Sequence, residues 1–137
     1  YSVGVSVPKP IYALNNVLVM EFIGENGRRA PLLKEVWQDL TPGELKNIFD
    51  EVVENLVKIV CKAKLVHADL SEFNIMVKND LSIVIIDVSQ AVPLSHPNAV
   101  EFLKRDIRNI HRFFYEEVEL DIPSEEELWS IVVKCLE

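Results

Sequence analysis

The strongest constraint on the fold is a long amphipathic helix whose start is marked in the sequence. Thr41-Pro42-Gly43-Glu44 supplies a capping hydroxyl, a proline suited to the first helical position and a glutamate that can bond back to the cap. Apolar residues then recur at helical spacing along one face: Leu45, Ile48, Phe49, Val52, Leu56, Ile59 and Val60. The pattern predicts a helix over residues 44–62 with one buried face.

Two segments carry strand signals. Residues 8–24 predict two short strands that turn at Asn15-Asn16, because asparagine tolerates the left-handed backbone that tight turns need. Residues 73–88 predict a hairpin of two apolar strands that turns at Asn79-Asp80. A polar, glycine-bearing connection over residues 24–31 is expected to follow the first pair of strands.

Two further helices are expected beyond the second hairpin. The first begins near Ser95-His96-Pro97 and runs to about Tyr115, and the second follows the capping pattern Ser124–Glu127. The predicted buried positions are Val100, Leu103, Ile107, Ile110 and Phe114 in the first, and Leu128, Val132 and Leu136 in the second. Together with a short helix over residues 32–39, this order of elements predicts an α+β fold.

The composition limits the classes of function. A chain of 137 residues, 49% of them hydrophobic, is long enough for one folded domain, and its longest apolar runs are too short to span a bilayer. No basic and apolar leader opens the chain, so we expect a cytoplasmic protein without membrane anchorage. The net charge of −8 argues against broad nucleic-acid binding, and no direct nucleic-acid motif is present. Lys104, Arg105, Arg108 and Arg112 could form a local basic patch, but we interpret them as a solvated helix face.

The two cysteines, Cys61 and Cys135, match no metal-ligand spacing. Each falls in an apolar helical context. We therefore expect two separate, reduced thiols that pack as small hydrophobic side chains in a reducing compartment.

A polar stretch interrupts apolar flanks at Leu65–Val77 ("LVHADLSEFNIMV"). His67, Asp69 and Asn74 follow the spacing H-x-D-x-x-x-x-N, and Asp87 ends the second strand of the predicted hairpin. Because a hairpin places its two ends side by side, Asn74 and Asp87 are expected at one rim, with Asp69 on the preceding loop. An amide oxygen and a carboxylate suit Mg²⁺, and a second carboxylate can accept the proton of an attacking hydroxyl. This combination predicts phosphoryl transfer.

Each of these residues alone has a plain structural explanation. Asp69 can cap a loop, Asp87 can begin a turn, and His67 can pack with its ring bonded to the backbone. Their joint occurrence, in order and on the expected helix, loop and hairpin, favours the phosphotransfer interpretation. Within it, we still expect His67 to be a packed residue and not a catalyst.

Five motifs give the chain a resemblance to a known family: "VLVMEFIG", "LVHADLSEFNIMV", "IIDVSQAV", "HPNAVEFLKRDIRNI" and "FF". Over about residues 8–115 they resemble the RIO family of atypical serine protein kinases, and within it the Rio1 branch. Ordinary eukaryotic kinases carry H-R-D and D-F-G where this chain has His67-Ala68-Asp69 and Asp87-Val88-Ser89. They also carry an activation loop and an A-P-E motif, which this chain lacks as RIO kinases do.

The resemblance implies the catalytic roles. Asp69 matches the catalytic aspartate and Asn74 the metal-binding asparagine. Asp87 matches the metal-binding aspartate, which in this family can itself accept phosphate. The implied cofactors are ATP and Mg²⁺ (or Mn²⁺), and the implied partners are a protein substrate and a pre-ribosomal particle, with a role in maturation of the small ribosomal subunit.

The resemblance also implies a nucleotide site. Its residues are Met20, Glu21, Ile23, Ser71, Glu72, Met76 and Ile86. The Glu21 carbonyl and the Ile23 amide would bond the edge of adenine, with Met20 as gatekeeper beside them. Met76 and Ile86 would floor the ring, while Ser71 and Glu72 would line the nucleotide and metal site. Ordinary core packing explains the two methionines and Ile86 equally well.

Two kinase features are missing from the sequence. The glycines form no G-x-G-x-x-G, and Lys9 stands between two prolines, a poor place for a phosphate-binding lysine. We therefore expect residues 1–24 to be hinge strands at the end of a largely absent N-terminal lobe, and residues 25–137 to be a kinase C-terminal lobe. A glycine-rich loop and a lysine are expected upstream of Tyr1 in a longer parent chain.

Two alternatives to a RIO-type kinase or ATPase stay open. A small-molecule phosphotransferase of the aminoglycoside or choline kinase kind shares the H-x-D-x-x-x-x-N spacing, although such enzymes tend to read "HGDLHPGN" and "IDF". The other alternative is a truncated, non-catalytic binding lobe. Without a lobe that clamps phosphates, the isolated chain is expected to be weakly active or inactive.

Overall fold

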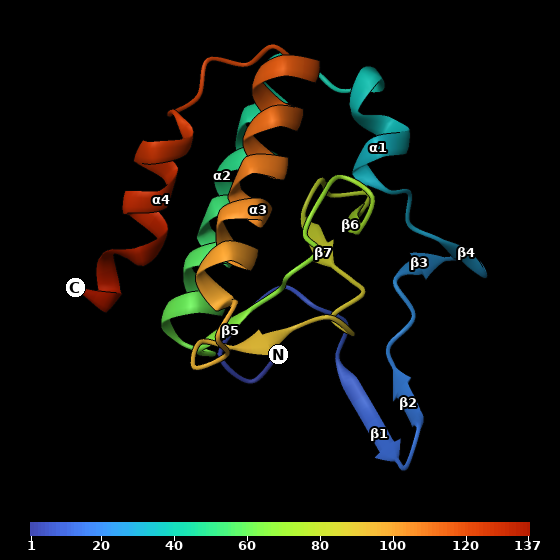
Figure 1. The fold of residues 1–137 in the computed structure, drawn as a ribbon. Coiled ribbons are helices and arrows are strands. Elements are labelled where there is room, and N and C mark those ends of the chain that lie inside the picture. Colours follow the sequence, from blue (N-terminus) through green and yellow to red (C-terminus); the bar gives the residue numbers. More distant parts are fainter.

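The computed structural model describes residues 1–137, and its longer helices lie side by side with small hairpins along one flank (Figure 1). The helices are α1 (Leu33–Val36), α2 (Pro42–Cys61), α3 (Ala99–His111) and α4 (Glu125–Val133). The strands are β1 (Pro10–Leu14), β2 (Val17–Met20), β3 (Gly24–Glu25), β4 (Arg28–Arg29), β5 (Leu65–Val66), β6 (Ile75–Val77), β7 (Ile83–Ile85) and β8 (Val92–Pro93). They pair as four antiparallel two-stranded sheets, β1–β2, β3–β4, β5–β8 and β6–β7. The predicted α+β class is confirmed.

Helix α2 forms as the sequence predicts. The Thr41 hydroxyl accepts a hydrogen bond from the Glu44 amide at 3.1 Å, and the Glu44 carboxylate accepts one from the Thr41 amide at 2.9 Å. The helix starts at Pro42, two residues before the predicted start, because proline suits the first helical turn. The predicted apolar face is buried, and Asn55 is buried along with it.

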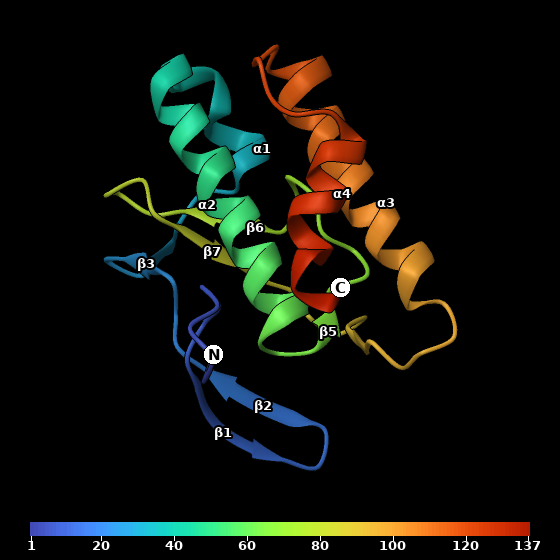
Figure 2. The ribbon, with the colours of Figure 1, turned by 90° about the vertical axis from the view of Figure 1, so that its left-hand side faces the viewer.

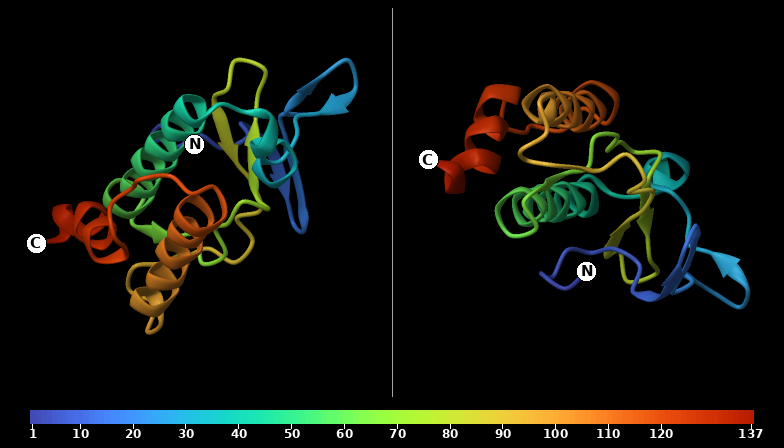
Figure 3. Two further views of the ribbon diagram at one scale, coloured as in Figure 1. Left: turned by 90° about the horizontal axis from the view of Figure 1, so that it is seen from above. Right: turned by 60° about the horizontal axis from the view of Figure 1, so that its bottom comes forward.

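The core joins these helices through aromatic side chains. Phe49 of α2 meets Phe114 edge-on, with ring centroids 5.2 Å apart, and Phe113 meets both Phe114 and Trp37. Phe113 and Phe114 lie in a π-helical turn, Arg112–Glu117, which extends α3. Seen from above, α4 lies on the side of the molecule away from β1–β2 and β3–β4 (Figure 3).

The start of α3 differs from the prediction. The helix begins at Ala99 rather than at Ser95, because His96 accepts the Asn98 amide at 3.0 Å and holds the preceding residues in a turn. As a result Ala99 is buried and Val100 is exposed, contrary to the predicted stripe. Leu136 is also exposed, whereas Leu128 and Val132 of α4 are buried as predicted.

The first hairpin projects from the body of the molecule (Figure 2). It turns at Asn15, whose φ of 53° is left-handed, as predicted. Every residue of β1 and β2 is exposed. The connection after it holds an additional small hairpin, β3–β4, whose turn places Asn26 and Gly27 at positive φ.

The expectation of two separate thiols is wrong. Cys61, the last residue of α2, forms a disulfide with Cys135 in the short 3₁₀ turn that follows α4. No local pattern predicts this pairing, because the two residues stand 74 positions apart and only the packing of α4 on α2 brings their Cα atoms to 5.9 Å. No helix combines the length and the apolar character needed to cross a membrane.

Candidate active site

The predicted catalytic loop runs from β5 to β6, and the β6–β7 hairpin closes behind it. The Ile86 amide donates to the Asn74 carbonyl at 2.9 Å, which extends the hairpin by one pair beyond Ile75 and Ile85. Asn74 therefore lies opposite Ile86, and Asp87 follows directly. The structure thus brings Asn74 and Asp87 to the same rim of the hairpin.

His67 connects the loop to this rim. Its Nδ1 accepts the Asp69 amide at 3.2 Å, and its Nε2 lies 3.1 Å from the Ile86 carbonyl oxygen. Because a carbonyl can only accept, Nε2 carries the hydrogen, and the ring is neutral with Nδ1 free to accept. The ring is buried, so His67 is the packed, backbone-bonded residue that the sequence predicts.

Helix α3 holds the loop on both sides of Asp69. The Asp106 carboxylate accepts the Ala68 amide at 2.8 Å and the Leu70 amide at 3.0 Å, and the Arg105 guanidinium donates to the Ala68 carbonyl. These three bonds fix Ala68 at a φ of 72°, which an alanine rarely adopts. Asp106 is fully buried, and burial raises the pKa of its carboxyl, an effect that the two backbone amides partly oppose.

The loop is also tied to itself around Asn74. The Asn74 amide group donates to the Asp69 carbonyl, and its side-chain oxygen accepts the Ser71 amide at 2.9 Å. Ser71 accepts the Phe73 amide through its hydroxyl at 3.2 Å. The Asp69 carboxylate is exposed and makes no hydrogen bond within the chain, so it is free to meet a substrate.

The oxygen atoms at the rim suit a hard divalent cation. Asp87, held at a φ of 59°, accepts the Ser89 hydroxyl at 2.9 Å through one carboxylate oxygen, which leaves the other oxygen free. The Asn74 side-chain oxygen accepts one bond and keeps a second lone pair. Mg²⁺ typically takes one or two protein oxygens of this kind, and these two fit that requirement.

The hinge segment offers one donor and one acceptor. The Glu21 amide donates to the Lys9 carbonyl and the Ile23 carbonyl accepts from the Ala30 amide, each at 2.8 Å. By contrast, the Glu21 carbonyl and the Ile23 amide make no hydrogen bond within the chain. These are the two groups that the sequence predicts at the edge of adenine.

Two of the predicted nucleotide-site residues, Met76 and Ile86, lie close to this segment. Met76 and Ile86 pack against a small cluster formed by Ile23, Ala30 and Val84. A cavity of about 640 Å³ with mainly apolar walls is lined by Met20, Ile86 and Asp87, among others. The structure therefore places the predicted gatekeeper, one floor residue and the metal aspartate around one cavity.

Glu72 stands apart from the other predicted site residues. Its carboxylate is buried and receives the Arg112 guanidinium at 3.2 and 3.3 Å. This pair joins the catalytic loop to the π-helical turn after α3. These contacts hold the loop, and the place of Glu72 in the nucleotide and metal site stays a prediction.

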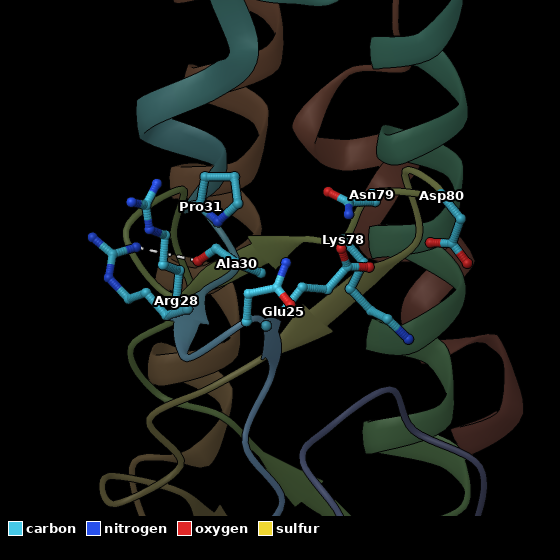
Figure 4. Close-up of a pocket in the computed structure, with 10 residues that line it drawn as sticks. Glu25, Arg28, Ala30, Pro31, Lys78, Asn79 and Asp80 are labelled. Atoms are coloured by element: carbon cyan, nitrogen blue, oxygen red, sulfur yellow. Dashed lines mark hydrogen bonds between the residues drawn. The ribbon is translucent and has the colours of Figure 1, made fainter.

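A second cavity, of about 700 Å³, lies between the β3–β4 turn and the β6–β7 turn (Figure 4). Its lining includes Glu25, Arg28, Lys78 and Asp80, and the Arg29 guanidinium donates to the Ala30 carbonyl beside it. None of the predicted site residues lines it. Of the two cavities, only the apolar one is lined by predicted site residues, so it is the candidate for the nucleotide. The other predicted nucleotide-site residues do not line it: Glu21, Ile23, Ser71, Glu72 and Met76.

Three side chains that contact the catalytic loop were not identified from the sequence. Arg105, Asp106 and Arg112 fall in the segment interpreted as a solvated face, yet each contacts the catalytic loop. The available signal was the position of Asp106, which lies one helical turn from both Leu103 and Ile110 on the apolar stripe. A charged residue on a buried stripe indicates a specific polar partner.

Comparisons with known proteins give a consistent result. The family model of the RIO domain matches residues 1–127. Serine/threonine-protein kinase RIO3 of Caenorhabditis elegans is 42% identical over 130 residues, which cover 94% of this chain and 26% of that protein. RIO-type serine/threonine-protein kinase Rio1 of Haloferax volcanii is 47% identical over 111 residues, which cover 81% of this chain and 36% of that protein.

A solved structure shares the fold. The crystal structure of the Rio2 kinase–ADP/Mg²⁺–phosphoaspartate complex from Chaetomium thermophilum superposes with a TM-score of 0.71 at 27% identity. The match covers 96% of this chain and 40% of that chain. The chain thus spans between about a quarter and two fifths of the length of these three proteins.

Proposed function

The chain belongs to the RIO domain family, and from that premise we propose that it is the hinge and C-terminal lobe of an ATP- and Mg²⁺-dependent, RIO-type serine/threonine protein kinase or ATPase. The observation that carries the proposal is the shared rim, where the hairpin pairing and the His67 ring hold Asn74 and Asp87 beside the Asp69 loop. In this assignment residues 1–24 are the hinge strands and residues 25–137 are the lobe.

The proposed chemistry assigns one role to each side chain at the rim. Asp69 accepts the proton of the attacking hydroxyl, for which its carboxylate is free. The Asn74 side-chain oxygen and the free Asp87 carboxylate oxygen would hold Mg²⁺. Magnesium ATP, when bound, supplies the phosphoryl group and the charge that neutralises its oxygens. Asp87 is also a candidate phosphoryl acceptor, since the similar Rio2 structure is a phosphoaspartate complex.

The hinge and the apolar cavity would bind the base. The free Glu21 carbonyl accepts from the adenine edge, and the free Ile23 amide donates to it. Met20, Met76 and Ile86 supply apolar contacts around the ring, as adenine sites require. Ser71 positions Asn74 through its amide, while Glu72 holds the loop through Arg112.

The wider role follows the family. We propose a protein substrate and a partner in the maturing small ribosomal subunit, with action in the cytoplasm and in ribosome biogenesis. Membership in the RIO domain family argues against the small-molecule phosphotransferase alternative. A lobe that binds without turnover remains the competing outcome of the test below.

The test is Mg²⁺-dependent transfer of label from radioactive ATP by the intact protein. Asp69→Asn should reduce the rate about 10²-fold or more, because removal of a general base typically costs between ~10² and ~10⁴. Asp87→Asn should abolish transfer together with any label retained on the protein. Asp121→Asn, which changes an exposed aspartate that makes no side-chain bond, is the matched control and should leave the rate unchanged.

The alternative outcome is equally clear. If the intact protein binds ATP but transfers no label to protein or water, the chain is a binding lobe and not part of a kinase. Binding that survives Asp69→Asn but weakens with Asp87→Asn would still assign Asp87 to the metal.

A further inference from the structure

We propose that the Cys61–Cys135 disulfide is a reversible, solvent-accessible redox switch. Its oxidation stabilises the packing of α4 on α2, and its reduction weakens that packing. Cys61 is the last residue of α2, and Cys135 is the middle residue of the turn Lys134–Leu136 that follows α4. Their Cα separation of 5.9 Å lies within the range that a disulfide bridges without movement of the backbone. The proposal is independent of the kinase assignment.

Helix α4 has few other anchors. It spans Glu125–Val133, a length at which an isolated helix is marginal in water. Only Leu128 and Val132 are buried. The half-buried Trp129 and Val133 also pack against the core. Its polar links are the Lys104 ammonium over the Trp129 ring at 5.7 Å and an exposed Arg108–Glu125 ion pair at 3.7 Å. A covalent bond at the end of so short a helix therefore adds to this packing in holding it against α2.

The bond is accessible to small thiols. Cys135 is exposed and Cys61 is half-buried, so an attacking thiolate can reach the Cys135 sulfur. The thiolate bonds to Cys135 Sγ, the bond between the two cysteine sulfurs breaks, and its electron pair leaves on Cys61 Sγ. A second small thiol then resolves the mixed disulfide. In total two small thiols become one small disulfide, and each cysteine gains one electron and one proton.

The structure also accommodates the reduced state. Cys61 Sγ lies 3.6 Å from the Val132 carbonyl oxygen, within reach of a hydrogen bond from a thiol. The released Cys61 thiol therefore has an acceptor on α4 itself. Cys135, in contrast, is left at the surface near the end of the described chain. Reduction should then loosen α4 without unfolding the core.

The experiment uses the intact protein, equilibrated with either oxidised glutathione or excess dithiothreitol. Peptide mapping without reduction should find the Cys61–Cys135 cross-link only in the oxidised sample. The melting temperature should fall by about 5 to 15 °C on reduction, because the bond closes a long loop. Amide hydrogen exchange in residues 125–136 should become about tenfold faster or more, with little change in α2.

Cys135→Ser is the matched control, because it removes the bond at an exposed position. This variant should behave like the reduced protein in either buffer. Three results would each overturn the proposal: no cross-link after oxidation, an unchanged exchange rate in α4 after reduction, or a melting temperature of Cys135→Ser that still responds to dithiothreitol.

Discussion

Two hairpins of similar composition have opposite surroundings in this molecule. Both β1–β2 and β6–β7 are antiparallel pairs built mainly from apolar residues. Every residue of β1–β2 is exposed. In β6–β7 only Met76 is half-buried, and all the other residues are buried, including Val84 in the cluster beside the hinge. The sequence pattern predicts both hairpins, but it does not distinguish their environments.

The difference lies in what covers each hairpin. The Val77 amide donates to the Pro31 carbonyl at 2.8 Å and the Ile85 amide to the Ser6 carbonyl at 2.7 Å, so both outer edges of β6–β7 are paired. Helices α1 and α2 pack against its strands. No element of this chain covers β1–β2 in the same way, and a bare two-stranded hairpin is marginal in water. The proposed function assigns this uncovered surface to the junction with the rest of the kinase.

The largest expected effect comes from one substitution made in both hairpins. Ile85→Ala removes a fully buried side chain and should lower the free energy of unfolding by about 2–5 kcal/mol. Ile11→Ala changes a side chain that is 63% exposed and should cost no more than about 0.5 kcal/mol in this chain. Equilibrium urea unfolding of the two variants measures both values. Equal losses would show that β1–β2 is covered in solution.

Local signals account for the parts of the fold that the sequence predicts. The Thr41–Glu44 cap, the stripe of α2 and the turn at Asn15 each depend on neighbouring residues, and all three are confirmed. The missed features depend on contacts between distant segments. The Cys61–Cys135 bond and the burial of Asn55, which accepts the Ser6 amide at 2.7 Å, exist only once the chain has folded.

The candidate site divides in the same way. The order of His67, Asp69, Asn74 and Asp87 along the chain predicts the rim, because a hairpin fixes which residues meet. The side chains that hold the loop come from α3, and their spacing to the loop carries no motif. The sequence indicates only that Asp106 is an acid on an apolar stripe. The structure shows that its carboxylate accepts two amides of the catalytic loop.

Asp106→Asn tests how the packed region holds its catalytic loop. An asparagine can accept from only one side-chain oxygen, so the Ala68 or the Leu70 amide loses its partner. The free energy of unfolding of the variant should be lower by about 1–3 kcal/mol at neutral pH. Its turnover should fall more than its affinity for ATP. Urea unfolding and steady-state kinetics measure these two effects. Unchanged turnover would show that the loop keeps its shape without this carboxylate.

The pH dependence gives the same substitution a second readout. Because the pKa of Asp106 is raised in the folded state, the folded protein binds more protons than the unfolded chain just above the ordinary carboxyl pKa. Its contribution to stability should therefore be largest at low pH and fall as pH rises from near 4 through the raised value. In Asp106→Asn this pH-dependent loss of stability is absent. The difference in free energy of unfolding between the wild type and the variant should therefore shrink as pH rises through that window.

The smallest expected effect concerns an ion pair between the β3–β4 hairpin, which follows β1–β2 in the chain, and α1, which packs against β6. Arg29 of β4 donates to both carboxylate oxygens of Glu35 in α1, at 2.8 and 3.0 Å. The Arg29 guanidinium, with the Leu32 amide, lowers the pKa of Glu35 to about 2. Any stability from this pair is present above the ordinary carboxyl pKa and is lost as pH falls towards 2. Both side chains are exposed, so solvent screens the interaction and Arg29→Ala should leave the unfolding midpoint almost unchanged.

A carboxyl-resolved NMR titration of Arg29→Ala should nevertheless show the Glu35 pKa rising towards its ordinary value. If the pKa stays low, the Leu32 amide alone lowers it, and the ion pair has no measurable part in linking β4 to α1.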